Sequence, residues 1–371
     1  MSHLDPLESI VDTVIAPRAA ELDRTASFPR EAIDALGQAG LLGLISATDV
    51  GGMGLGLAEA TQVVERIARD CPATAMVVTM HYAGTTLVEK YGPEDVRRDI
   101  AAGRHLTTLA WSESGSRSHF WAPVGTATAD GDHVLLNAGK SMVTAAGEAD
   151  SYVWSSTPVA AEGASTIWLV DRRLDGLGSP RPFDGLGLRA NASAPVTAKD
   201  VRLPLARRMG EDGQGQAIMF GDELPTFVNL IASVSIGLME GALQRAVKHV
   251  TATGFAAGGT LADLPTLRAQ LAQARNAVDQ AKGIRAMALA SIDGGAEDAF
   301  LRVLQVKACA AEAALSVTDT AMRVCGGAAF RKDVGIERLF RDSRAAAIMA
   351  PTSDVLFDLT GRLMCGMPLM E

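Results

Sequence analysis

Two histidines are the side chains best suited to move a proton near neutral pH, because imidazole is the only side chain that ordinarily titrates there. His81 follows Met80 in a largely apolar stretch with helical spacing, and His119 lies in the aromatic run Ser118-His119-Phe120-Trp121. Each has two interpretations. His81 is either a core histidine with a satisfied ring nitrogen or a catalytic group. His119 either stacks on its aromatic neighbours in a turn or supplies a proton donor to a substrate cavity.

Three hydroxyl side chains, Ser112, Ser118 and Thr144, lie beside short β-type runs. Strand-edge backbone and short hydroxyls can hold the polar edge of a flat cofactor without filling the space of a substrate. Taken alone, however, their spacing favours ordinary strand-end or turn hydrogen bonds for all three.

The stretch 106–205 predicts a β-domain. Asp130-Gly131-Asp132 is a hairpin signal, because glycine takes a positive φ without steric cost and Asp tolerates a tight turn. A second turn is predicted at Asn137-Ala-Gly139, and β-type runs follow at Tyr152-Val-Trp-Ser-Ser156 and Thr166-Ile-Trp-Leu-Val170. Several short strands at this spacing predict a small antiparallel barrel or sandwich.

Apolar residues with helical period fill both flanks of this stretch. We therefore expect an α+β chain with a helical N-terminal domain at 1–105 and a C-terminal four-helix bundle at 206–371. Proline suits the first turn of a helix, so Pro225 predicts a helix from Phe227 to roughly Thr251. That start leaves Glu223 as a capping or surface residue.

Composition and charge restrict the classes of partner that the protein can bind. The 371 residues carry a net charge of −9, which makes nucleic acid an unsuitable partner because phosphate binding needs a basic face. The four cysteines are scattered without a C-x-x-C pair, which indicates reduced thiols in a cytoplasmic protein and no metal site. No apolar run reaches the length of about 18 residues that a membrane-spanning helix needs.

The order of several motifs resembles the acyl-CoA dehydrogenase superfamily over nearly the whole chain. The resemblance is carried by Trp111-Ser-Glu-Ser, Gly139-Lys-Ser-Met-Val-Thr144, Gly185-Leu-Gly-Leu-Arg189, Val201-Arg-Leu-Pro204 and Gly210-Glu-Asp-Gly-Gln-Gly215. It implies a flavin bound at the β-domain, namely FAD, with FMN as the alternative. It also implies a homodimer or homotetramer, a small-molecule substrate such as an acyl thioester, and an electron-transfer protein or flavin reductase as partner.

The resemblance assigns particular residues to the flavin. Trp111, Ser112 and Thr144 are placed against the isoalloxazine ring, with Met142 where the family usually has a stacking Trp. Ser118 is placed near the flavin phosphates, and Arg323 replaces a family Gln as a phosphate partner through its planar donor fork. Further cofactor positions implied in this way are Gly326, Gly327 and Thr352. Some oxygenases of this superfamily also place a histidine near the flavin from the region of His81.

The same resemblance shows that the usual catalytic base is missing. A dehydrogenase of this family needs a carboxylate over the α-carbon of the thioester, and the family supplies it from one of two places. Those places hold Ala350 and Phe227 here, and neither can take a proton. Three hypotheses follow: an acyl-CoA dehydrogenase-like oxidoreductase without an ordinary base, a flavin-dependent monooxygenase of the same fold, or an inactive flavin- or acyl-binding protein.

Overall fold

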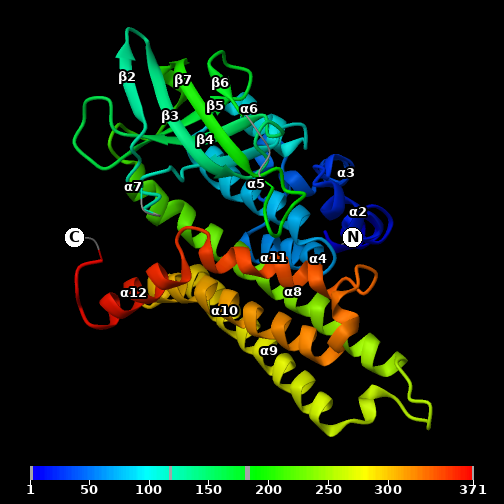
Figure 1. The fold of residues 1–371 in the computed structure, drawn as a ribbon. Coiled ribbons are helices and arrows are strands. Elements are labelled where there is room, and N and C mark those ends of the chain that lie inside the picture. Colours follow the sequence, from blue (N-terminus) through cyan, green and yellow to red (C-terminus); the bar gives the residue numbers. More distant parts are fainter. Residues whose placement is uncertain (1–2, 117–118, 180–183, 370–371) are drawn as a thin grey trace.

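The structure is a computed structural model, which describes residues 3–116, 119–179 and 184–369. Helices precede and follow a central block of strands. Figure 1 shows the strands gathered at one end of the molecule and the long C-terminal helices at the other, with the N-terminal helices beside them. The expected order of a helical domain, a β-domain and a helical bundle is confirmed.

The N-terminal helices enclose an apolar core. They are α1 (Leu4–Ile10), α2 (Ala16–Thr25), α3 (Arg30–Gln38), α4 (Leu57–Ala68), α5 (Pro72–Tyr91) and α6 (Glu94–Ala101). A π-helical turn, Val11–Ile15, joins α1 to α2 just before Pro17. The wider turn lets the chain stay helical past a residue that lacks the N–H an α-helix requires.

The central strands form two four-stranded sheets with the orders β1-β4-β5-β8 and β2-β3-β7-β6. The strands are β1 (Thr107–Ala110), β2 (Thr126–Asp130), β3 (His133–Val143), β4 (Ser151–Ser156), β5 (Thr166–Asp171), β6 (Leu177–Gly178), β7 (Ala194–Pro204) and β8 (Arg208–Met209). The predicted hairpin is confirmed: Asp130 pairs with His133 and Gly131 has a φ of 64°. One pair departs from the antiparallel expectation, because β1 runs parallel to β4.

The predicted turn at Asn137-Ala-Gly139 is wrong. These residues lie inside β3, at a shift of register against β7. The Asn137 side chain bonds across the sheet, donating to Asp200 Oδ1 and accepting from the Asp200 backbone N–H, both at 2.9 Å. Asn137, a residue type common in turns, therefore stabilises a β-bulge within β3, and the strand continues past it to Val143.

The C-terminal helices pack as the predicted bundle. They are α7 (Gly215–Ile218), α8 (Leu224–Ala252), α9 (Pro265–Asp293), α10 (Ala299–Cys325), α11 (Ile336–Ile348) and α12 (Ser353–Met364). In Figure 1, α8 runs from the strands to the far end of the bundle, with α10 and α9 beside it. Gly237 and Gly241 permit α8 to touch α4, since a Cβ at either would lie 2.2 Å or 2.1 Å from a carbonyl oxygen of Glu65 or Arg69.

The expected start of the first bundle helix is wrong, with a consequence for Glu223. The helix begins at Gly215 and passes through a π-helical turn, Met219–Glu223, directly into α8. As at Pro17, the wide turn ends two residues before a proline, here Pro225. Glu223 is consequently neither a cap nor a surface residue: its exposed fraction is 1%.

The continuous helix Gly215–Ala252 is long and apolar enough to span a membrane, but 89% of its most apolar window is buried inside the protein. That burial marks it as a core helix of the fold.

Candidate active site

A cavity of about 330 Å³ lies where the β-domain meets the two helical parts. This size falls in the range of small-molecule sites. The β-domain supplies one wall, which contains Trp111, Ser112, Met142 and Thr144. The rest of the lining includes Glu223, Phe227 and Ala345 from helices, and Met349 and Ala350 from the segment after α11.

Backbone hydrogen bonds hold the polar wall in place. The Ser141 N–H donates to the Ser112 carbonyl over 2.8 Å, and the Thr108 hydroxyl donates to the Thr144 carbonyl over 2.9 Å. Met142 adopts a φ of 53° beside another register shift of β3, and its side chain is half exposed. The Thr144 hydroxyl lies 3.4 Å from Ser193 Oγ. This contact is long for a hydrogen bond between hydroxyl groups.

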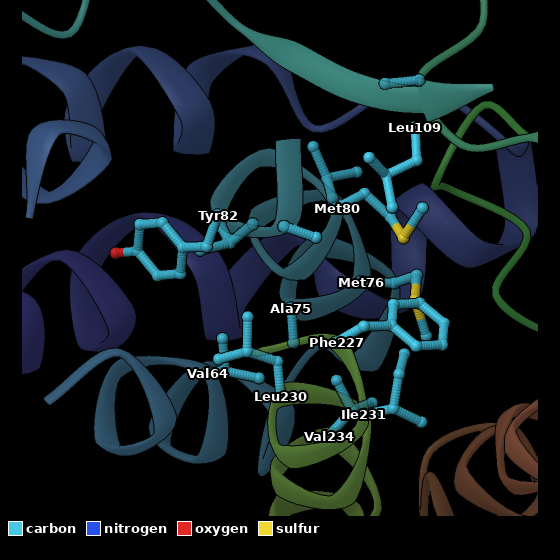
Figure 2. Packing of buried hydrophobic residues seen from close by; sticks show 14 of the residues in the cluster. Val64, Ala75, Met76, Met80, Tyr82, Leu109, Phe227, Leu230, Ile231 and Val234 are labelled. Atoms are coloured by element: carbon cyan, nitrogen blue, oxygen red, sulfur yellow. The ribbon is translucent and has the colours of Figure 1, made fainter. Parts of the chain in front are cut away.

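Phe227 belongs to the apolar floor of the cavity. Figure 2 shows its ring beside Met76 of α5 and Ile231 of α8, with Met80 and Leu109 on the side that faces the strands. The exposed fraction of Phe227 is 6%. At this position an aromatic ring stands where the superfamily resemblance predicted a possible carboxylate.

The second apolar position, Ala350, lies in the segment between α11 and α12. Lys307 of α10 fastens this segment: its Nζ donates to the carbonyls of Ala346, Met349 and Pro351 at 2.8, 3.0 and 2.7 Å. The ammonium group is fully buried, and burial lowers its pKa to about 7. The cavity wall at Ala350 is therefore held by the buried amino group of Lys307.

A second loop reaches the cavity through Gly187 and Leu188. A Cβ on Gly187 would lie 2.6 Å from the carbonyl carbon of Arg341, so only glycine fits this approach to α11. Beside it, Asp342 Oδ1 accepts the Leu188 N–H over 2.6 Å. Burial raises the pKa of the Asp342 carboxyl to about 6.

Two carboxylates line the cavity, and they differ in their partners. Glu113 forms a buried ion pair with Lys140 and accepts the N–H groups of Val124 and Gly125 at 2.6 and 2.8 Å. Glu223 makes no hydrogen bond or ion pair within the described residues, and its Oε1 is buried without a partner. Burial alone raises the pKa of the Glu223 carboxyl well above its usual range.

The structure places both histidines outside the cavity lining. His81 is fully buried in α5; its Nδ1 accepts the Thr107 N–H over 3.2 Å, so its Nε2 donates to the Leu42 carbonyl at 3.0 Å. Burial lowers the pKa of His81 to about 4, which keeps the ring neutral. His119 is exposed and stacks on Trp121 with a centroid separation of 4.7 Å.

The other predicted cofactor residues lie elsewhere. Ser118 falls outside the described residues. Thr352 caps α12, where its hydroxyl accepts the Val355 N–H at 3.3 Å. Arg323, Gly326 and Gly327 are at the exposed C-terminal end of α10, away from the cavity lining, so any contact they make with a cofactor stays a prediction.

The polar atoms of the cavity fit the flavin that the resemblance implied. A flavin needs apolar surfaces against its ring faces and hydrogen-bonding groups along its polar edge. Trp111 Nε1 is a buried donor without a partner among the described residues, and the Ser112 and Thr144 hydroxyls line the same cavity. The lining contributed by the helices and by the segment after α11 is apolar except for Glu223.

Family profiles match three consecutive parts of the chain. They are described as the N-terminal, middle and C-terminal domains of acyl-CoA dehydrogenase, and they match residues 4–103, 108–201 and 229–364 respectively.

Individual relatives match along nearly the full length. A cyclohex-1-ene-1-carbonyl-CoA dehydrogenase of Geobacter metallireducens is 27% identical over 97% of this chain and 96% of its own. A bovine short-chain specific acyl-CoA dehydrogenase is 29% identical over 91% and 83%. Butyryl-CoA dehydrogenase from Megasphaera elsdenii has the same fold, with a TM-score of 0.91 at 21% identity, covering 98% of this chain and 97% of its own.

The prolyl acyl carrier protein oxidase AnaB also shares the fold, with a TM-score of 0.89 at 18% identity and 98% coverage of both chains. One fold thus serves proteins named for different reactions, so the reaction must be argued from the site.

Three features of the site were missed from the sequence: the free Glu223, the Glu113–Lys140 pair and the clamp at Lys307. Lys307 had a visible signal, because it interrupts the apolar run around Val306 and Ala308. For Glu223 there was no comparable signal, because the π-helical turns before Pro17 and Pro225 are visible only in the structure.

Proposed function

Because this chain belongs to the acyl-CoA dehydrogenase superfamily, whose members are FAD-binding flavoproteins, we propose that it is an FAD-dependent oxidoreductase acting on an acyl thioester. The observation that carries the proposal is the cavity between the strands and the helical bundle. Its lining combines polar donors at Trp111, Ser112 and Thr144 with apolar side chains at Phe227 and Ala350.

The polar wall would hold the cofactor. Trp111 Nε1–H and the hydroxyls of Ser112 and Thr144 can donate to the polar edge of the ring, and Met142 would lie against it as an adaptable apolar side chain. When bound, FAD supplies the oxidant that accepts a hydride. The apolar wall would exclude water from the reacting carbons.

The apolar residues at positions 227 and 350 set this protein apart from the pattern implied by the resemblance. Both line the cavity, and neither can accept a proton. The same absence favours a second candidate, a flavin-dependent monooxygenase, because that chemistry needs no base at the α-carbon. Retention of three cavity-facing donors on the polar wall supports a functional flavin site over an inactive one.

We expect the enzyme to act as a homodimer or homotetramer and to pass electrons to a separate carrier or receive them from a reductase. Thr352, Arg323, Gly326 and Gly327 remain proposed contacts to the cofactor, the last three from the end of α10.

The absorption spectrum of the purified protein tests the cofactor directly, and acid release identifies FAD or FMN. Anaerobic mixing with butyryl-, isobutyryl- and glutaryl-CoA then tests the reaction. Bleaching of the flavin by an acyl-CoA is the expected result. A flavin that no acyl-CoA bleaches, but that consumes oxygen once a reductase supplies electrons, would replace the dehydrogenase with the monooxygenase.

A further inference from the structure

We infer that Glu223 is the proton acceptor of this cavity, the side chain that removes the α-proton of a bound acyl thioester. The inference rests on the proposed function and replaces the base that positions 227 and 350 do not provide. It assigns a catalytic role to a residue outside both of those positions.

Glu223 ends the π-helical turn and lies four residues before Phe227 on one continuous helix. Residues four apart share a helix face, and both line the cavity together with Thr144 and Ala350. The wide turn, whose occurrence inside helices often marks a functional site, is what carries a carboxylate to this wall.

No hydrogen bond or ion pair within the described residues uses the Glu223 carboxylate. Its neighbour Asp222 turns the other way and bonds Lys90 Nζ and Tyr91 Oη, each at 2.6 Å. The buried Glu65 is paired with Arg285 and Lys282. Glu223 alone among the buried carboxylates of the described residues has no partner. An unpaired buried acid lowers the stability of the fold, so its presence in a cavity points to a functional role.

The other acid at the cavity is already fully bonded. Both carboxylate oxygens of Glu113 are occupied, one by Lys140 and the other by two backbone N–H groups. Those bonds leave neither oxygen of Glu113 free to receive a proton from a substrate. Glu223 instead has a raised pKa, which gives a stronger base once the carboxylate forms.

Other charged groups near Glu223 are already committed. Lys90 and Tyr91 of α5 are bound to Asp222, and Arg189 on the neighbouring loop donates to Asp184 at 2.5 Å and to the Asp23 carbonyl at 3.0 Å. Burial is accordingly the cause of the raised pKa of Glu223.

In the proposed step, the bond between the α-carbon and its hydrogen breaks, and the proton passes to a carboxylate oxygen of Glu223. The electron pair left behind becomes the second bond between the α- and β-carbons. Bound FAD would supply the oxidant that takes the β-hydrogen with its electron pair, and Glu223 would return its proton to water after the product leaves.

Proton transfer can be measured apart from oxidation. With the flavin reduced beforehand under anaerobic conditions, hydride transfer is blocked, and exchange of the α-hydrogens of butyryl- or isobutyryl-CoA in D₂O reports the base alone. Glu223→Gln should slow this exchange by on the order of 10²–10⁴-fold. The matched control is Asp222→Asn, the same chemical change at the adjacent residue outside the cavity lining, which should exchange at the wild-type rate.

A second readout needs no substrate. A folded-state pKa above the unfolded value of an acid lowers stability as pH rises from the unfolded pKa through the folded one. The thermal midpoint of Glu223→Gln should therefore exceed that of the wild type at pH 8, and the difference should shrink toward pH 4. A carboxylate with a structural role would give a lower midpoint for the variant.

The outcomes separate the two proposals. If the wild type binds flavin and is bleached by an acyl-CoA, while Glu223→Gln exchanges α-hydrogens at the wild-type rate, the role of Glu223 is wrong and the proposed function stands. A lower midpoint for Glu223→Gln at pH 8 also overturns the role of Glu223. If the wild type binds no flavin, the proposed function fails, and the inference fails with it.

Discussion

Lys307 Nζ donates a 2.7 Å hydrogen bond to the Pro351 carbonyl, across 44 positions of sequence, and so ties the bundle core to the cavity wall. The same ammonium group holds the carbonyls of Ala346 and Met349. The segment that carries Ala350 is thus positioned by a residue that never touches the cavity.

Lys307→Met should therefore loosen the cavity wall. The variant keeps the length of the side chain but leaves three carbonyls without their donor, each worth about 1 kcal/mol. We expect a loss of about 2–4 kcal/mol in the free energy of unfolding, measured by urea denaturation, together with weaker flavin binding. Lys332→Met, an exposed lysine with a side-chain exposed fraction of 78%, is the control. Equal stability of Lys307→Met and the control would contradict the clamp.

Asp342 predicts a specific pH dependence. Burial raises the pKa of its carboxyl from 3.8 to about 6, so between these values the folded protein holds a proton that the unfolded chain has lost. The contribution of Asp342 to stability should then fall by about 3 kcal/mol as pH rises through that window. Asp342→Asn, which can still accept the Leu188 N–H, should remove this fall.

The measurement is urea denaturation of wild type and Asp342→Asn at pH 4, 5, 6 and 7. The free energy of unfolding of Asp342→Asn should rise relative to that of the wild type as pH rises. Asp358→Asn, at a carboxyl with an exposed fraction of 64%, should keep a constant difference from the wild type. A constant difference for Asp342→Asn as well would show that the buried carboxyl does not titrate as stated.

Thr144→Val tests the polar wall. The substitution preserves shape and removes the hydroxyl, while the backbone carbonyl that binds Thr108 remains. Loss of one hydrogen bond of about 1 kcal/mol should weaken FAD binding roughly fivefold, measured by fluorescence titration of the flavin-free protein. Thr144→Ser keeps the hydroxyl and should bind nearly as the wild type does. Unchanged affinity in Thr144→Val would remove Thr144 from the flavin site.

The order of domains and the hairpin at Gly131 could be predicted because each depends on local chemistry: helical period in the flanks, and a turn that needs a positive φ. The errors came where tertiary contacts override such rules. Asn137 has the chemistry of a turn residue, but Asp200 on the neighbouring strand captures its side chain. That pairing is not visible from the local sequence.

The candidate site shows the same division. Trp111, Ser112, Met142 and Thr144 were predicted from the resemblance, and the structure places all four at one cavity. The burial of Glu223 could not be predicted from a rule that starts a helix at Pro225, because the π-helical turn keeps the helix continuous past the proline. Which acid is free and which is paired depends on contacts between segments far apart in sequence.

The most direct test of the account is the rate of anaerobic flavin reduction by butyryl-CoA in Glu223→Gln and in the double variant Glu223→Gln/Ala350→Glu. Ala350 lines the same cavity as Glu223, so a carboxylate there can take over the proton. We predict slow reduction in the single variant, by on the order of 10²–10⁴ relative to wild type, and at least partial recovery in the double variant. Reduction at the wild-type rate in Glu223→Gln would contradict the account.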